Sequence, residues 1–185
     1  MKITLISTYE IGRQPFGIAS PVRWLRDEGF EVEVLDLSID AIAPEQITEA
    51  SLICFYVPMH TATKLAIEAL PKIQRVNPEA RICFYGLYAP MNADYLRSLG
   101  ADFILGGEFE EDLVTIALQL RENDNSGELP GVSLNRLQFK TPLRDGLPEL
   151  SKYAHLMNDD GTLDKIVGYT ETTRGCKHTC RHCPI

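Results

Sequence analysis

The sequence predicts a doubly wound α/β fold, in which helices cover both faces of a five-stranded parallel sheet. Three observations predict it: short β-rich runs alternate with amphipathic segments through residues 1–121, glycine and proline punctuate the segments, and the alternation stops near Arg121. Strands that alternate with helices pair in parallel, because each helix returns the chain to the same edge of the sheet. The strand order that we expect is 2-1-3-4-5, as in flavodoxin-like folds.

The elements follow in order along the chain. The expected strands are residues 2–7, 31–37, 52–57, 81–85 and 103–105. The first helix is expected to begin at Ser20-Pro21, since proline fits the first helical turn, and to end at Gly29. Three further helices are expected, and they span residues 61–76, 92–99 and 110–120.

Beyond residue 121 the composition changes. Residues 122–150 are polar and rich in glycine and proline, so we interpret them as a linker. Residues 158–161 read Asn-Asp-Asp-Gly, which predicts a turn between strands at 153–157 and 164–173. The expected organisation is therefore an α/β domain (1–121), a linker (122–150) and the start of a second domain (151–185).

Composition narrows the function classes. The 185 residues are 44% hydrophobic, which is enough for one packed core, and their formal net charge is −8. An acidic balance argues against a nucleic-acid partner and against binding to an anionic membrane. No apolar run approaches the ~20 residues of a membrane span, and the N-terminal run is too short for a signal peptide. We expect a cytoplasmic protein.

The five cysteines form two groups. Cys54 and Cys83 lie alone in apolar runs, which is typical of small buried hydrophobic residues. Cys176, Cys180 and Cys183 have the spacing C-x3-C-x2-C. Three thiolates on one loop can hold three irons of a cubane cluster and leave the fourth iron open. A zinc site with His178 or His182 as the fourth ligand is an alternative, and three unrelated cysteines are another.

This cysteine loop, preceded by Arg174 and Gly175, resembles the cluster loop of the radical S-adenosylmethionine (SAM) superfamily. The resemblance implies that Cys176, Cys180 and Cys183 bind a [4Fe–4S] cluster whose open iron is chelated by SAM. It also implies an electron donor such as flavodoxin or ferredoxin. One electron then cleaves SAM to methionine and a 5′-deoxyadenosyl radical. His182 stands where an aromatic residue is common in that superfamily.

The α/β domain resembles the B12-binding domain that precedes many radical SAM motifs. The resemblance and the strand-edge rule for open α/β sheets imply six residues near a corrin, which are Gly12, Pro58, Met59, Gly86, Gly107 and Glu108. The first loop lacks the D-x-H-x-x-G motif, so a bound cobalamin would have no protein histidine on cobalt. Either cobalamin binds in this way or the domain has kept the fold without the cofactor. We interpret His60 as structural or solvated.

Four stretches, at residues 6–10, 57–63, 83–90 and 174–184, resemble the bacterial CUAEP/CCAEP-tail radical SAM proteins. This resemblance implies that the chain is the N-terminal part of a longer enzyme, inactive without the rest of its barrel. The alternative is a non-catalytic α/β binding module with a zinc-binding cysteine loop. Dinucleotide and P-loop motifs are absent, and the third strand ends at Tyr56-Val57-Pro58 without the aspartate of a receiver domain.

Overall fold

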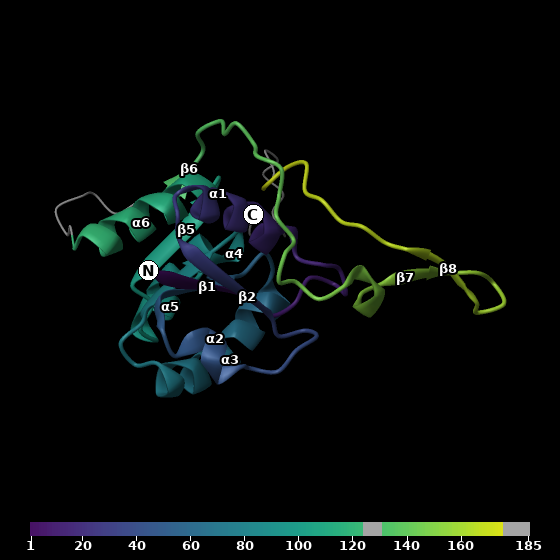
Figure 1. Ribbon diagram of the computed structural model, residues 1–185, viewed down its shortest axis with the longest axis horizontal. Helices are drawn as coiled ribbons and strands as arrows, with labels where there is room; N and C mark the ends of the chain where they lie inside the picture. Colours follow the sequence, from purple (N-terminus) through teal and green to yellow (C-terminus); the bar gives the residue numbers. More distant parts are fainter. Residues whose placement is uncertain (124–130, 176–185) are drawn as a thin grey trace.

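The computed structural model describes residues 1–123 and 131–175. Their main body is one parallel sheet covered by helices (Figure 1). The strand order in this sheet is β2-β1-β3-β4-β5-β6. The strands are β1 (Lys2–Ser7), β2 (Glu31–Asp36), β3 (Ala50–Tyr56), β4 (Arg81–Tyr85), β5 (Phe103–Gly107) and β6 (Val132–Ser133). The predicted doubly wound fold and the order 2-1-3-4-5 are confirmed.

The sheet has six strands, so the expectation of five was wrong. Residues Val132 and Ser133, within the expected linker, pair in parallel with Gly106 and Gly107 of β5. A strand of two residues carries no periodic pattern that a sequence could reveal. The close approach depends on Gly107, whose φ is +65°, because a Cβ atom there would overlap the carbonyl oxygen of Ser133.

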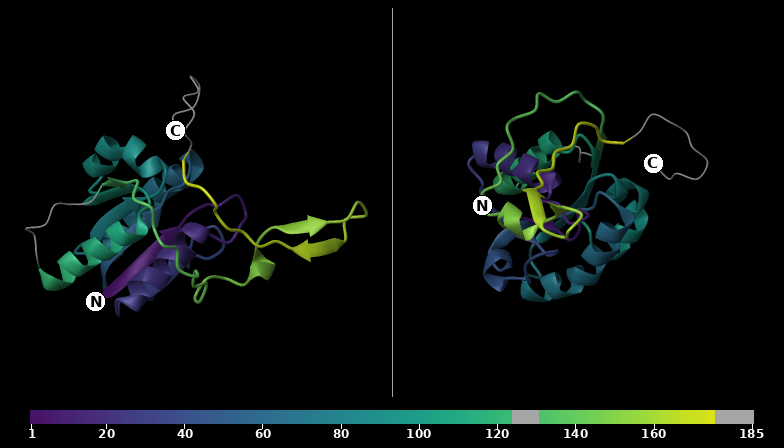
Figure 2. Two further views of the ribbon diagram at one scale, coloured as in Figure 1. Left: turned by 90° about the horizontal axis from the view of Figure 1, so that it is seen from above. Right: turned by 90° about the vertical axis from the view of Figure 1, so that its right-hand side faces the viewer.

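Helices cover both faces of the sheet (Figure 2). Helices α1 (Phe16–Asp27) and α6 (Glu110–Glu122) pack on one face. The other face carries α2 (Pro44–Ile47), α3 (His60–Val76), α4 (Tyr88–Met91) and α5 (Ala93–Ser98). Side chains that alternate along β3 and β4 enter these two cores in turn, which explains why both strands are apolar throughout. Cys54 and Cys83 face each other across β3 and β4 and are fully buried, as expected.

Helix α1 begins at Phe16, four residues before the expected start, and so Pro21 lies inside it. Proline cannot donate a hydrogen bond to the carbonyl four residues earlier, which here belongs to Gly17. The hydroxyl of Tyr85 donates to that carbonyl oxygen instead, at 2.9 Å. A tertiary contact therefore replaces the missing helical bond and allows the helix to continue through the proline.

Gly17 is also where α1 passes closest to β3, and we expect Gly17→Ala to destabilise the protein. A Cβ atom there would overlap the ring of Tyr56, which is buried between Tyr85 and Phe109. Overpacking of this kind costs about 1–3 kcal/mol, and we expect a net loss although alanine raises helix propensity by roughly 1 kcal/mol. Urea unfolding measures the loss. The control is Gly131→Ala, where a Cβ atom meets nothing within 4 Å, and equal effects of the two variants would contradict the steric explanation.

The C-terminal part runs back along the domain and then leaves it as a hairpin (Figure 1). After a 3-10 turn at Leu150–Lys152, strands β7 (His155–Met157) and β8 (Leu163–Ile166) pair in antiparallel fashion. The predicted turn closes them, with the Gly161 amide donating to the Asn158 carbonyl oxygen at 2.8 Å. The second strand ends at Ile166 and not at residue 173, because within the described ranges residues 167–173 have no strand beside them. They return instead to the carboxyl edge of the main sheet.

Among the helices of residues 1–123 and 131–175, none combines the length and apolar character that a bilayer crossing requires.

Candidate functional site

A cavity of about 920 Å³ lies at the carboxyl ends of the central strands. Its walls come from the ends of β3, β4 and β5, from the segment at β6 and from residues 169–175. Most of the lining is apolar, and it includes Pro58, Met59, Leu87, Pro90, Met91, Phe109, Val132 and Leu134. Cavities of this size and character are typical of small-molecule sites, and this edge is where open α/β sheets bind ligands.

Four of the six residues proposed for the strand edge line this cavity, and they are Pro58, Met59, Gly86 and Gly107. Gly12 and Glu108 are not among the lining residues. The carbonyl oxygen of Gly12 accepts a hydrogen bond of 2.7 Å from the amide of Ala154, so this glycine contacts the C-terminal segment. Glu108 forms an ion pair with Arg174 beside the cavity.

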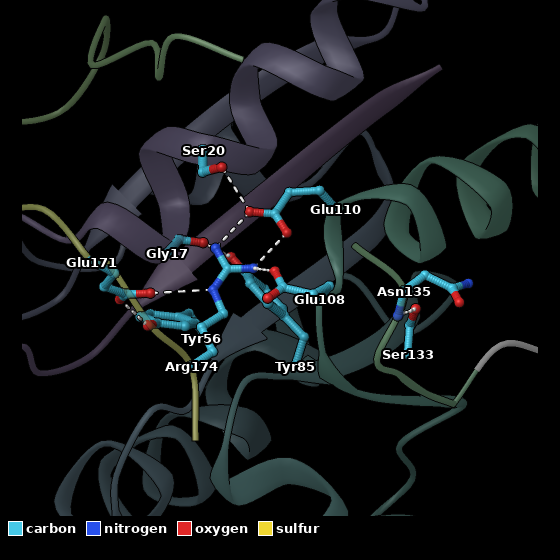
Figure 3. Close-up of polar contacts among 10 residues, drawn as sticks. All are labelled: Gly17, Ser20, Tyr56, Tyr85, Glu108, Glu110, Ser133, Asn135, Glu171 and Arg174. Carbon is cyan, nitrogen blue, oxygen red and sulfur yellow. Dashed lines mark hydrogen bonds and ion pairs between the residues drawn. The ribbon is translucent and has the colours of Figure 1, made fainter. Parts of the chain in front are cut away.

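Arg174, the residue two positions before Cys176, is bound to three carboxylates (Figure 3). Its guanidinium binds Glu110 through two nitrogens at 2.6 Å each, Glu108 at 3.2 Å and Glu171 at 3.3 Å. The two bonds to Glu110 make a bidentate pair, the strongest geometry for an arginine and a carboxylate. Glu110 is fully buried and also accepts a hydrogen bond from the Ser20 hydroxyl at 2.7 Å. Segments 64 residues apart are thus joined in the interior.

The surroundings of Arg174 hold it in the charged form. Its guanidinium carbon lies 3.9 Å from the centre of the Phe109 ring, and its side chain is 10% exposed. Burial acts to lower the pKa of Arg174, but the hydrogen bonds and charge of Glu110, with Glu171 and Glu108, outweigh it and raise that pKa. One buried cation is therefore shared by three carboxyl groups.

Glu10 is a site residue that the sequence analysis did not identify. It follows β1, lines the cavity and is only 4% exposed. Its Oε2 atom is buried and has no hydrogen-bond partner among the described residues. Burial is the largest cause, and the charge of Glu171 the second largest, of a pKa for Glu10 that is raised to about 8. The only sequence signal was an acidic residue shortly after an apolar strand, at the edge where strands end.

Tyr56 connects the sheet to the segment before the cysteines. Its hydroxyl donates a hydrogen bond of 2.6 Å to Glu171 Oε1, and its ring packs against Tyr85 and Phe109. Burial, with the nearby charge of Glu171, raises the pKa of Tyr56, which keeps the hydroxyl protonated as a donor. The aromatic cluster forms a rigid base below Arg174 and fixes the position of Glu171.

The three clustered cysteines, Cys176, Cys180 and Cys183, lie outside the described residues. Gly175, the last residue before them, lines the cavity. Within residues 1–123 and 131–175, no group of three or more His, Cys, Asp or Glu side chains is arranged so that it could hold a metal ion. His60 begins α3, is exposed and does not line the cavity.

No protein-family model and no curated protein matches the chain. Solved structures with a similar fold include a CheY-like response regulator receiver domain protein from Methanospirillum hungatei JF-1, at 20% identity and a TM-score of 0.47, covering 68% of this chain and 98% of that one. Another is a response regulator protein from Burkholderia pseudomallei with a phosphorylated aspartic acid, at 16% identity and a TM-score of 0.46, covering 66% of this chain and 69% of that one. At these identities the likeness concerns the fold alone.

Proposed function

We propose that this chain is the N-terminal portion of a radical SAM enzyme with a B12-binding-like domain. Cys176, Cys180 and Cys183 would hold three irons of a [4Fe–4S] cluster, and SAM would chelate the fourth. The observation that carries the proposal is the spacing C-x3-C-x2-C directly after Arg174 and Gly175. Three thiolates from one short loop suit a cluster with an open iron better than a closed structural metal site.

The anchoring of Arg174 supports this function. A loop that begins two residues after a buried bidentate ion pair starts from a defined position. Because Arg174 and Gly175 both line the cavity, the chain enters the cysteine motif beside a ligand-sized space. A molecule bound in the cavity would then lie close to the chemistry that SAM provides.

Cobalamin is the candidate cofactor for this cavity. The apolar walls suit the face of a large organic ring, and no histidine lines the cavity in the described part of the chain. Pro58, Met59 and Gly86 would contact such a ring, and its cobalt would have no histidine ligand. The same apolar walls would also suit another ligand, if the domain has kept the fold without binding cobalamin.

The second candidate is a non-catalytic α/β binding module with a zinc-binding tail. It is favoured by His178 and His182, either of which could complete a four-ligand zinc site with the cysteines. The two functions differ in the metal and in the fate of SAM.

Metal content and SAM binding in the full-length protein distinguish these functions. We expect anaerobic reconstitution with iron and sulfide to give about four irons per chain, as three cysteines and an open iron require. Adding SAM should change the paramagnetic resonance spectrum of the reduced cluster. Stoichiometric zinc in the purified protein, with no response to SAM after reconstitution, would contradict the radical SAM function and support the zinc-binding module.

A further inference from the structure

In the described part of the chain the Glu10 side chain forms no hydrogen bond to residues 169–175, which lead to the cysteine loop, yet it is buried in the wall of the cavity. Every polar contact of Arg174 described above involves another carboxylate, and Oε2 of Glu10 has no partner in the described ranges. A buried carboxyl group without a partner costs free energy that the fold must supply elsewhere. Such a group at the wall of an apolar cavity is what a ligand with a complementary polar group would satisfy.

The charge around Glu10 determines which polar group that is. The titratable groups that influence it come from its own loop, from the ends of β2 and β3 and from the segment before the cysteines, and they are Arg13, Asp36, Tyr56, Tyr169 and Glu171. Carboxylates outnumber cations in this set. Arg13 lies over the Tyr169 ring, and Arg174 is already bound by three carboxylates. An anionic ligand would therefore be repelled, whereas a cation would gain an unpaired carboxylate.

We propose that the cavity binds a small molecule with an apolar body and one protonated nitrogen group, an amine or amidine, whose counter-ion is Glu10. The apolar walls contact the body, and the carboxylate of Glu10, which lines the cavity, accepts a charge-assisted hydrogen bond from the nitrogen. This inference rests on the proposed function only for the position of the site. It follows the alternative in which the domain keeps the fold without cobalamin, and it names the charge of the molecule that then occupies the cavity.

Binding of such a cation is linked to a proton. The Glu10 carboxyl has a pKa of about 8, so near neutral pH it is mostly protonated and must lose its proton to the solvent when the cation binds. Affinity should therefore increase by up to tenfold per pH unit as the pH rises towards 8, and should level off above it. A neutral ligand would not show this dependence.

Three probes of the same shape test the charge: benzamidine is a cation, benzamide is neutral and benzoate is an anion. Methyl resonances of methionine report the location, because Met59 and Met91 line the cavity whereas Met1 and Met157 do not. In the 185-residue chain at pH 8, benzamidine should shift the Met59 and Met91 signals and leave the other two unchanged. Benzamide should bind at least tenfold more weakly, and benzoate should cause no shift.

The variant Glu10→Gln tests the counter-ion, and Glu68→Gln, the same change on the exposed surface of α3, is its control. Glu10→Gln should weaken benzamidine binding at least tenfold and remove its pH dependence, while Glu68→Gln should alter neither. The proposal is overturned if benzamidine causes no shift at its highest soluble concentration, or if benzoate or benzamide binds as tightly. It is also overturned if Glu10→Gln keeps the wild-type affinity and pH profile. None of these outcomes depends on the metal in the cysteine loop, so they are separable from failure of the radical SAM function.

Discussion

The proposed radical SAM function predicts that replacing any one of Cys176, Cys180 or Cys183 with alanine abolishes the release of 5′-deoxyadenosine by the full-length protein. Each thiolate would bind one iron, so a single loss leaves two protein ligands for the cluster and opens a second iron to solvent. The [4Fe–4S] state would be lost or would no longer present one unique site to SAM. The measurement is chromatography of 5′-deoxyadenosine after anaerobic incubation with SAM and dithionite.

The other two cysteines provide a matched control. Cys54 and Cys83 are fully buried on neighbouring central strands, and burial, together with the neighbouring Cys54, raises the pKa of the Cys83 thiol. Their replacement by alanine should leave the iron content and the 5′-deoxyadenosine yield unchanged. Full yield from a variant of the clustered cysteines would refute their assignment as ligands. Loss of iron from a folded Cys54→Ala or Cys83→Ala variant would contradict the assignment of these two cysteines as buried residues that bind no metal.

Arg174→Met is expected to have the largest effect on stability. The change keeps much of the side-chain volume but leaves the fully buried Glu110 without its bidentate partner and Glu171 without its cation. Removal of one partner from a buried ion pair costs about 3–5 kcal/mol. The chain can reduce this cost by releasing the segment before the cysteines, which lets water reach Glu110. Urea unfolding measures the loss, and amide hydrogen exchange of residues 169–175 detects the release.

Arg97→Met is the surface counterpart of this variant. Arg97 is 3.9 Å from Asp94, and both side chains are exposed, so its loss should cost no more than about 1 kcal/mol. In a double-mutant cycle, adding Glu110→Gln to Arg174→Met should recover part of the stability, because the unpaired buried charge is then removed. If Arg174→Met and Arg97→Met are equally mild and exchange at residues 169–175 stays slow, the carboxylate cluster does not anchor the segment.

Local patterns were enough to predict the main sheet. Residues of β1, β3 and β4 form apolar runs bounded by glycine, proline or polar residues, and a parallel sheet buried on both faces requires such runs. The burial of Cys54 and Cys83 follows from the same runs. The turn at residues 158–161 depends on residue preferences that act within four positions, so it too could be predicted.

The sequence by itself determined the order of the first five strands, the longer helices between them and the spacing of the three clustered cysteines, because these are properties of neighbouring residues. The tertiary structure decided which distant residues meet. Pro21 lies inside α1 because the hydroxyl of Tyr85, 68 residues away from Gly17, donates a hydrogen bond to the Gly17 carbonyl oxygen. Arg174 is buried because it pairs with the carboxylate of Glu110 on α6. Glu10 is a site residue because residues from the ends of β2 and β3 and from the C-terminal part lie around it in the folded chain. Such contacts depend on complementary charge and shape between segments that are distant in the sequence. The residue pattern of one segment therefore does not identify the segment that it contacts.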